Sequence, residues 1–267
     1  MKVAIIGGTG RIGSKVVARL REQGHEAVPA ALDTGVNTLT GEGLGQTLAG
    51  AAVVIDVSDS PSIEAAAALR FFETSTRNLL AAEAAAGVGH HVALSVVGCD
   101  RVPESGYLRA KVVQEKLIRS SPISYSIVRS TQFYEFVKRI ADGATDGNVV
   151  RIPPVLYQPI AAADVATAVC RFAVGGPLNG VVEVAGPQQF RFDEFIRLGL
   201  RAYHDVREVV ADPRARYFGA ELGERALIPG DDASLGKIRF DDWLGQSDQS
   251  PRQERSDDAP SVVLQGR

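Results

Sequence analysis

The chain has 267 residues, and its 29 basic and 32 acidic residues leave a formal net charge of -3. A chain this close to neutral lacks the electrostatic footprint of nucleic-acid binding, so we expect no nucleic-acid partner. Hydrophobic residues make up 45% and charged residues 23% of the sequence, which is ordinary for a soluble globular protein with a sizeable core. No apolar run approaches the roughly 18 residues of a membrane span, so we expect no membrane partner.

Several functional classes are disfavoured by what the sequence lacks. The N-terminal run MKVAIIGGTG enters a glycine turn and has no cleavage site after a longer apolar segment, so it is not expected to be a signal peptide. Two cysteines, Cys99 and Cys170, cannot form a disulfide framework, and we therefore expect a cytoplasmic protein. The four histidines have no metal-ligand spacing, so no metal site is predicted. GxSxG, HExxH and CxxC motifs are absent, which disfavours serine hydrolases, zinc proteases and thiol redox proteins.

Strand-length apolar runs alternate with helical patterns over the first half of the chain. The predicted strands cover residues 3–6, 26–31, 52–57, 91–97 and 125–128. The first predicted helix begins at Ile12 and stops at Gly24. The second runs from Pro61, after a cap at Ser60, to Gly87, and the third covers 107–119. Pro29 indicates that residues 26–31 are not a central strand. Residues 32–50 are predicted to be loops around a short strand and helix. Such alternation is typical of right-handed βαβ units in a parallel sheet.

The second half of the chain is less regular. Short strands are predicted at 148–152 and 181–184, and a helix is predicted from a cap at Asp164 to about Phe172. We expect one doubly wound, Rossmann-type α/β domain over residues 1–245, with a small discontinuous substrate lobe. The lobe is assigned to about 133–147 and 187–245. Residues 246–267 are too polar to bury a core and are predicted to form a disordered tail.

A glycine-rich loop joins the first predicted strand to the first predicted helix. Gly7, Gly10 and Gly13 of GGTGRIG match GxxGxxG, and the loop also contains a GxGxxG match. Glycines at such a junction permit a tight turn and let backbone N–H groups approach a pyrophosphate at the positive end of a helix. The alternative is a glycine-rich turn without a ligand, but the strand-turn-helix context favours a dinucleotide site.

The identity of the dinucleotide depends on Asp33 and Arg11. Asp33 lies 20 residues after Gly13, the distance at which an acidic side chain holds the ribose 2′-OH of NAD. It could instead start a turn with Thr34 and Gly35. Arg11 could reach a 2′-phosphate, and on this ground we favour NADP(H) over NAD. The remaining candidate cofactor contacts are Thr9, Ile12, Val57, Ser58 and Ser130, although 57–59 could merely lead into a helix and 130–132 could be an ordinary loop.

Tyr107 and Lys111 are four residues apart in a predicted helix, so both project from one face. Ser95 comes 12 residues before Tyr107, near the carboxyl end of a predicted parallel strand, and ligands bind at that edge of open α/β sheets. A phenol has an ordinary pKa near 10, and a nearby ammonium lowers it. Tyr107 could then act as a general acid towards an alkoxide, with Lys111 holding ribose hydroxyls and Ser95 holding the carbonyl oxygen.

At these residues the chain resembles the short-chain dehydrogenase/reductase superfamily, in its extended and atypical, NmrA-like branch. The resemblance covers about residues 1–245 and rests on GGTGRIG, on Ser95 with YLRAK at 107–111, and on Asn78 in TRNLLAAEAAAG, with weaker similarity in IVRSTQFYEF, PIAAADVATAV and VEVAGP. It implies that the loop glycines line the pyrophosphate and that Ser95, Tyr107 and Lys111 form a catalytic trio. The asparagine that some members use has no clear counterpart, and Asn78 is expected to support helix packing.

These observations predict an NAD(P)-dependent oxidoreductase that transfers hydride between NADPH and a carbonyl-type small molecule by a Ser-Tyr-Lys mechanism. The principal alternative is an NmrA-like regulator that binds a dinucleotide and senses redox state without turnover. A nucleotide-sugar epimerase or dehydratase ranks third, because only about 55 residues follow VEVAGP before the predicted tail. The oligomeric state is left open.

Overall fold

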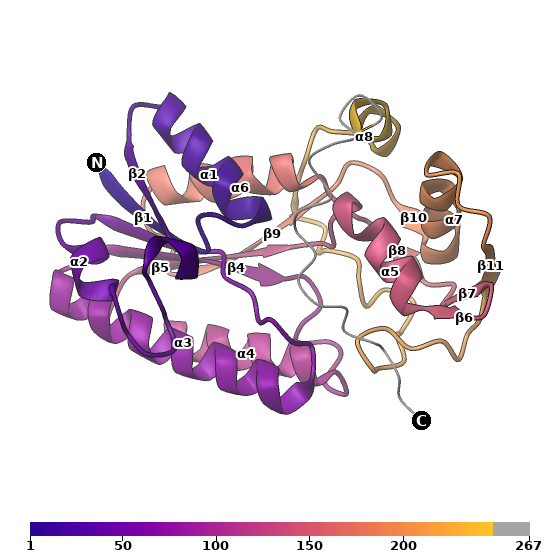
Figure 1. The fold of residues 1–267 in the computed structure, drawn as a ribbon, viewed down its shortest axis with the longest axis horizontal. Coiled ribbons are helices and arrows are strands. Elements are labelled where there is room, and N and C mark those ends of the chain that lie inside the picture. Colours follow the sequence, from indigo (N-terminus) through magenta and orange to yellow (C-terminus); the bar gives the residue numbers. More distant parts are fainter. Residues whose placement is uncertain (248–267) are drawn as a thin grey trace.

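A seven-stranded sheet forms the centre of the computed structural model, which describes residues 1–247. Its strands are β1 (Lys2–Ile6), β2 (Glu26–Ala30), β3 (Val53–Asp56), β4 (His90–Val96), β5 (Tyr125–Ser130), β9 (Gly180–Ala185) and β12 (Ser234–Leu235). All neighbours pair in parallel, in the order β12-β9-β5-β4-β3-β1-β2 (Figure 1). The strand order reverses beside β1, and ligands bind outside the carboxyl ends of strands at such a reversal. The predicted doubly wound α/β fold is confirmed.

Helices cover both faces of this sheet (Figure 1). On one face, α1 (Arg11–Glu22) packs beside α6 (Ala162–Val174). On the other face, the long α3 (Ala65–Ala86) packs along α4 (Gly106–Arg119), with the short α2 (Leu44–Leu48) against α3. Because helices cover both faces of the sheet, its strands are continuous apolar runs. In β3, for example, every residue is buried.

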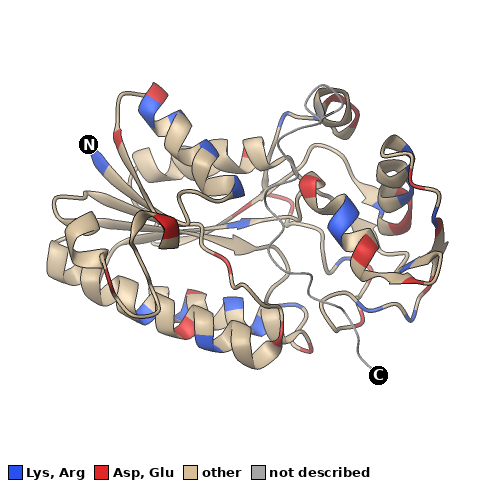
Figure 2. Cartoon of the chain, viewed as in Figure 1, with Lys and Arg blue, Asp and Glu red and all other residues tan. Residues whose placement is uncertain are grey.

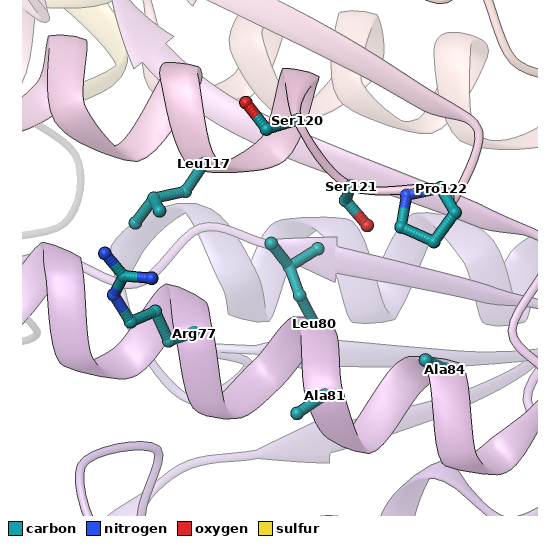
Figure 3. A pocket seen from close by; sticks show the side chains of 8 residues that line it. All are labelled: Arg77, Leu80, Ala81, Ala84, Leu117, Ser120, Ser121 and Pro122. Atoms are coloured by element: carbon teal, nitrogen blue, oxygen red, sulfur yellow. The ribbon is translucent and has the colours of Figure 1, made fainter.

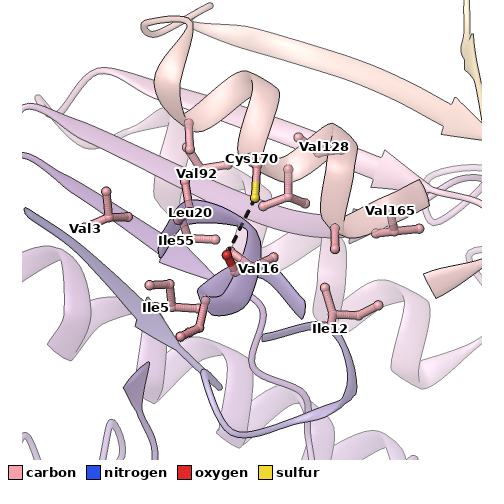
Figure 4. Packing of buried hydrophobic residues seen from close by; sticks show 14 of the residues in the cluster. Val3, Ile5, Ile12, Val16, Leu20, Ile55, Val92, Val128, Val165 and Cys170 are labelled. Carbon is pink, nitrogen blue, oxygen red and sulfur yellow. Dashed lines mark hydrogen bonds between the residues drawn. The ribbon is translucent and has the colours of Figure 1, made fainter. Parts of the chain in front are cut away.

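The core under α1 and α6 is formed by branched aliphatic side chains (Figure 4). Ile5 from β1 and Val92 from β4 meet Leu20 of α1 in this cluster, and all three are fully buried. The thiol of Cys170 on α6 is directed to the carbonyl oxygen of Val16 on α1, at 3.8 Å. This cysteine is therefore a small packing residue between two helices.

A separate lobe follows β5 and has its own aromatic core. Its elements are η2 (Tyr134–Phe136), α5 (Val137–Gly143), β6 (Thr145–Asp146), β7 (Val149–Ile152), β8 (Leu156–Tyr157), β10 (Phe190–Arg191), α7 (Phe192–Ala202), β11 (Glu208–Ala211) and α8 (Phe240–Ser247). Tyr134, Phe195 and Phe240 are fully buried there, with ring centroids 4.6 to 6.2 Å apart. Tyr134 is thus part of the lobe core and does not line a substrate pocket. Basic and acidic side chains are interspersed over the helices and the lobe (Figure 2).

The edge strand β2 and the segment 32–50 after it can be compared with the elements that the sequence predicts there. Pro29 pairs with Ile5 on β1, and β2 is the edge strand of the sheet, as its proline indicated. Residues 32–50 contain η1 (Leu32–Thr34) and α2, but no strand, since only the Asn37–Glu42 bridge pairs there. Asn78 on α3 donates to the carbonyl oxygens of Thr38 and Leu39, at 2.9 and 3.0 Å, so it holds this loop. Asn78 thus fixes a loop to α3, and its predicted role in helix packing stays a prediction.

Two predicted helix starts are wrong. The helix α3 begins at Ala65, because the Glu64 carboxylate accepts hydrogen bonds from the backbone N–H of Ala66 and Ala67, whereas the hydroxyl of Ser60 bonds within its own turn. The helix α6 begins at Ala162, and Asp164 lies inside its first turn. The Asp164 carboxylate accepts from the backbone N–H of residues 237 and 238 instead, which ties α6 to the end of the lobe.

The last described helix, α8, includes residues 246 and 247, and the rest of the predicted disordered tail lies outside the described residues. Over residues 1–247 the structure contains no helix with the length and apolarity to cross a membrane.

A buried ion pair joins the sheet to α4. Arg129 on β5 donates from Nε and one terminal nitrogen to the two carboxylate oxygens of Glu115, both at 2.8 Å, and its other terminal nitrogen lies 2.7 Å from Asp100. Glu115 also accepts the hydroxyl of Ser95 at 2.7 Å. Burial acts to raise the pKa of Glu115, but the hydrogen bonds from Arg129 and Ser95 outweigh it and hold that pKa below its ordinary value.

We expect Arg129→Met to lower the free energy of unfolding by about 3 kcal/mol, because it leaves the Glu115 carboxylate buried without its partner. Arg119 pairs with the same carboxylate at 3.4 Å from an exposed position, so Arg119→Met should cost about 0.5 kcal/mol or less. Urea denaturation of both variants measures the difference. Equal losses in the two variants would contradict the assignment of this pair as the buried link between β5 and α4.

Candidate functional site

Two positions of the loop between β1 and α1 require glycine. Gly7 has a φ of 76°, a left-handed conformation that favours glycine. A Cβ on Gly13 would lie 2.0 Å from the carbonyl oxygen of Gly7, so no larger residue fits where the helix meets the turn. These two glycines are therefore required by the fold itself.

The third glycine of the motif has no such packing requirement. Gly10 is the N-cap of α1 with an ordinary φ of -77°, and a Cβ on it would meet only the carbonyl oxygen of Gly7, at 3.3 Å. It supplies no side-chain cap, and the first turn of α1 contains no acidic residue. The backbone N–H groups of this turn, including those of Ile12 and Gly13, have no intrahelical acceptor. This positive, uncovered helix end fits a dinucleotide pyrophosphate.

Asp33 and Arg11 lie on different sides of this loop. The hydroxyl of Thr9 donates to the Asp33 carboxylate at 3.1 Å, so Asp33 in η1 forms a turn and also contacts the glycine loop. Arg11 opens α1 and is exposed. Burial raises the pKa of Glu135 in the lobe, and the charge of Arg11 opposes that rise, so Arg11 acts towards the β5 side. Sequence patterns gave no sign of Glu135, which is far from Arg11 in the chain.

The loop after β3 connects the glycine loop to the Tyr-Lys helix. A Cβ on Gly7 would lie 3.0 Å from the backbone of Ser58, so the two loops are in contact. Ser58 donates from its N–H and hydroxyl to Asp56, at 3.0 and 2.6 Å, which closes a tight turn at the end of β3. Val57 packs against the core under α1. The next residue, Asp59, is exposed and reaches Tyr107.

Tyr107 lies in the first turn of α4, after an N-cap at Ser105. Its hydroxyl donates to Asp59 at 2.7 Å, and its ring is stacked on Phe218 of the lobe and edge-on to Phe72 of α3. Only 8% of the residue is exposed. Burial and the adjacent Asp59 carboxylate raise the pKa of Tyr107 well above its ordinary value. The prediction that a nearby ammonium lowers this pKa is therefore wrong, because the buried phenol bonds to a carboxylate.

Lys111 projects from the same face of α4 and is buried. Its ammonium donates to the carbonyl oxygen of Leu94 on β4 at 2.9 Å and to the side-chain oxygen of Gln114, and it lies 4.4 Å from the centre of the Phe72 ring. Gln114 in turn donates to Asp56 at 3.0 Å. Burial lowers the pKa of Lys111, and the carboxylates of Asp56 and Asp59 oppose that decrease.

The three residues of the predicted trio are neighbours in the fold but bond to different partners. Ser95, near the end of β4, is 2% exposed and donates its hydroxyl to Glu115. Among the described residues, no hydrogen bond joins any two of Ser95, Tyr107 and Lys111. The partners Gln114 and Glu115 were missed at the sequence level, although both follow Lys111 at helical spacing on the buried face.

The end of β5 adds an unsatisfied hydroxyl near this edge. Ser130 is buried and its carbonyl oxygen accepts from Val97 at 2.9 Å. Thr131 follows it, and its hydroxyl is buried without a hydrogen-bond partner within residues 1–247. A buried hydroxyl of this kind needs an explanation, such as a water or a ligand.

The histidines are structural. His91 on β4 is fully buried and bonds to Glu83 of α3 at 2.8 Å, while His90 bonds to Ser126 on β5 at 2.9 Å. Both residues lie at the amino end of β4, away from the glycine loop.

A shallow pocket of about 430 Å³ lies between the outer sides of α3 and α4 (Figure 3). Arg77 and Leu80 line it from α3, and Leu117, Ser120 and Pro122 line it from the end of α4. Because α4 ends there and leads into the amino end of β5, this pocket lies at the opposite edge of the sheet from the glycine loop. It is not the dinucleotide site.

The chain belongs to the NAD(P)H-binding family, which matches it over residues 7–174. No curated protein matches the chain significantly. The matched range includes the glycine loop, the Tyr-Lys helix and the end of β5. The predicted class of cofactor, NAD or NADP, is therefore confirmed.

Solved structures show the same fold over nearly the whole chain. MoeE5, in complex with UDP-glucose and NAD, superposes with a TM-score of 0.68 and 19% identity, covering 94% of this chain and 99% of MoeE5. The UDP-glucose 4-epimerase of Thermotoga maritima, with UDP-glucose, gives 0.70 and 18%, with 91% and 96% covered. RMD from Pseudomonas aeruginosa, complexed with NADPH, gives 0.65 and 17%, with 91% and 96% covered. The two neighbours bound to UDP-glucose are covered over nearly their whole length, so chain length does not separate this protein from them.

We expect Gly10→Ala to leave the free energy of unfolding within about 1 kcal/mol of wild type, because its Cβ has room to adjust. The affinity for NADH and NADPH should fall at least about tenfold, since the methyl group occupies the approach of the pyrophosphate. Gly45→Ala, on α2 with nothing within 4 Å, is the matched control and should change neither. Calorimetric titration gives the affinities. Undiminished affinity in Gly10→Ala would exclude this loop as the dinucleotide site.

We expect Asp33→Asn to shift preference towards NADPH by about tenfold, because it removes a negative charge that would repel a 2′-phosphate. Arg11→Met should shift it towards NADH if the guanidinium serves that phosphate. The measurement is the ratio of the two dissociation constants in each variant. A ratio unchanged in both variants would place the ribose elsewhere.

Proposed function

We propose that the protein is an NAD(P)-dependent oxidoreductase acting on a carbonyl-type small molecule. One observation carries the proposal: Ser58 lies against Gly7 of the glycine loop, and the adjacent Asp59 bonds to Tyr107. A single loop thus links the candidate pyrophosphate site to a phenol. When bound, the dinucleotide supplies or accepts the hydride.

In this proposal Tyr107 moves the proton. In the reducing direction its hydroxyl gives the proton to the substrate oxygen as that oxygen becomes an alcohol, and the phenolate left behind is stabilised by the Lys111 ammonium. The phenol must first exchange its hydrogen bond to Asp59 for one to the substrate. Two of the three Lys111 N–H groups donate to Leu94 and Gln114, so one remains for a ribose hydroxyl.

Ser95 and Thr131 are the hydroxyls available for a substrate oxygen. Ser95 would have to exchange Glu115 for the substrate, and it loses a charge-assisted hydrogen bond in doing so. Thr131 has no partner to give up within the described part of the chain. We retain Ser95 in the proposed trio and add Thr131 as a candidate.

The second candidate function is a dinucleotide-binding redox sensor without turnover. The observation that favours it is that Ser95, Tyr107 and Lys111 are each already satisfied by protein groups, namely Glu115, Asp59, Leu94 and Gln114. A sensor needs only a change in dinucleotide binding, whereas an enzyme must release these bonds in each cycle.

We expect Tyr107→Phe to keep the ring packing and the dinucleotide affinity while turnover falls about 10²- to 10⁴-fold, the usual contribution of a general acid. Tyr125→Phe, at the amino end of β5, is the control and should leave turnover unchanged. The assay follows oxidation of NADH and NADPH with a panel of ketones, aldehydes and nucleotide-sugar ketones.

Two outcomes would overturn the enzymatic assignment. Turnover equal to wild type in Tyr107→Phe would show that Tyr107 is not the acid. Tight dinucleotide binding by wild type with no oxidation by any compound of the panel would favour the sensor.

A further inference from the structure

The hydrogen bond between Asp59 and Tyr107 has no place in a Ser-Tyr-Lys trio. We infer that Asp59 is a positioning residue for Tyr107: its carboxylate holds the phenol protonated and directed at the loop after β3 until substrate replaces it. The role of Asp59 in turnover rests on the proposed function. The hydrogen-bonded pair of Asp59 and Tyr107, called the dyad below, does not depend on that function.

Asp59 is itself held in place by its own loop. Its Oδ1 atom accepts the phenol of Tyr107 at 2.7 Å and the backbone N–H of Ser60 at 2.8 Å. Ser60 is fixed in turn by bonds with Ser62, and Ser58 by bonds with Asp56. The carboxylate oxygen is therefore presented to the phenol by the fold.

The ring of Tyr107 lies between two aromatic side chains. The ring is stacked on Phe218 with centroids 5.1 Å apart and a 14° angle between planes, and Phe72 meets it at 5.9 Å. Asp59 is exposed, so it lies between this enclosed phenol and solvent.

The groups that act on the pKa of Tyr107 come from three segments of the chain. Asp59 of the loop after β3 raises its pKa, as does Tyr217 from the segment after β11, whereas Arg139 of α5 lowers it. Lys111 lies on the same helix, and the Asp59 carboxylate acts on both Lys111 and Tyr107. Asp59 is the one full negative charge hydrogen-bonded to the phenol, so its removal should have the largest effect.

The negative charge of Asp59 determines the direction in which its removal shifts the pKa of Tyr107. A carboxylate disfavours the phenolate, so Asp59→Asn should lower the pKa of Tyr107 while the amide oxygen still accepts the hydrogen bond. Reduction needs the protonated phenol and is lost as pH rises through that pKa. The high-pH loss of activity should therefore begin at lower pH in Asp59→Asn.

The test is a pH titration of tyrosine 13Cζ NMR signals in the protein without dinucleotide, with Tyr107→Phe assigning the resonance. In wild type the Tyr107 signal should stay that of a neutral phenol up to the highest pH at which the protein is folded. In Asp59→Asn the Tyr107 signal should begin to move towards that of a phenolate within the pH range in which the protein is folded. Asp59→Glu should restore much of the wild-type behaviour, and Asp146→Asn, an exposed carboxylate on β6, is the control for charge alone.

Identical Tyr107 titrations in wild type and Asp59→Asn would overturn the dyad, whatever the protein catalyses. A lowered pKa in the NMR titration with no shift in the high-pH limb of turnover would overturn the positioning role. Absence of turnover in wild type, with the NMR shift present, would instead count against the proposed oxidoreductase.

Discussion

The buried ammonium of Lys111 is the constraint around which the site is arranged. A charge in the interior is costly unless it is hydrogen-bonded and paired. Here Leu94 and Gln114 supply oxygen acceptors, Phe72 supplies an aromatic face, and Asp56 reaches the ammonium through Gln114. Lys111 and Gln114 together therefore link the carboxyl ends of β3 and β4 to the buried face of α4.

The same arrangement places the loop after β3 between the glycine loop and Tyr107. Its position beside the strand-order reversal puts Ser58 against the glycine loop, where the uncovered N-terminus of α1 suits a pyrophosphate. Its next residue, Asp59, bonds to Tyr107. In the proposed function the glycine loop binds the dinucleotide and the Tyr-Lys helix moves the proton, and the loop after β3 lies between them.

The fold and the glycine loop could be predicted from sequence because their signals are local. Apolar runs identified the strands, and Gly7 and Gly13 are fixed by backbone geometry that no other residue satisfies. The start of α3 was misplaced because a glutamate competed with a serine for the cap. The partner of Tyr107 could not be predicted, since Asp59 and Tyr107 are 48 residues apart and meet only after the sheet has formed.

A crystal structure of the protein with bound NADH tests the central claim most directly. The account predicts phosphates at the N-terminus of α1 and a nicotinamide ring on the side of Tyr107 and Lys111, with a substrate-sized space beside the phenol. Phosphates away from the glycine loop, or a nicotinamide directed away from Tyr107, would contradict it.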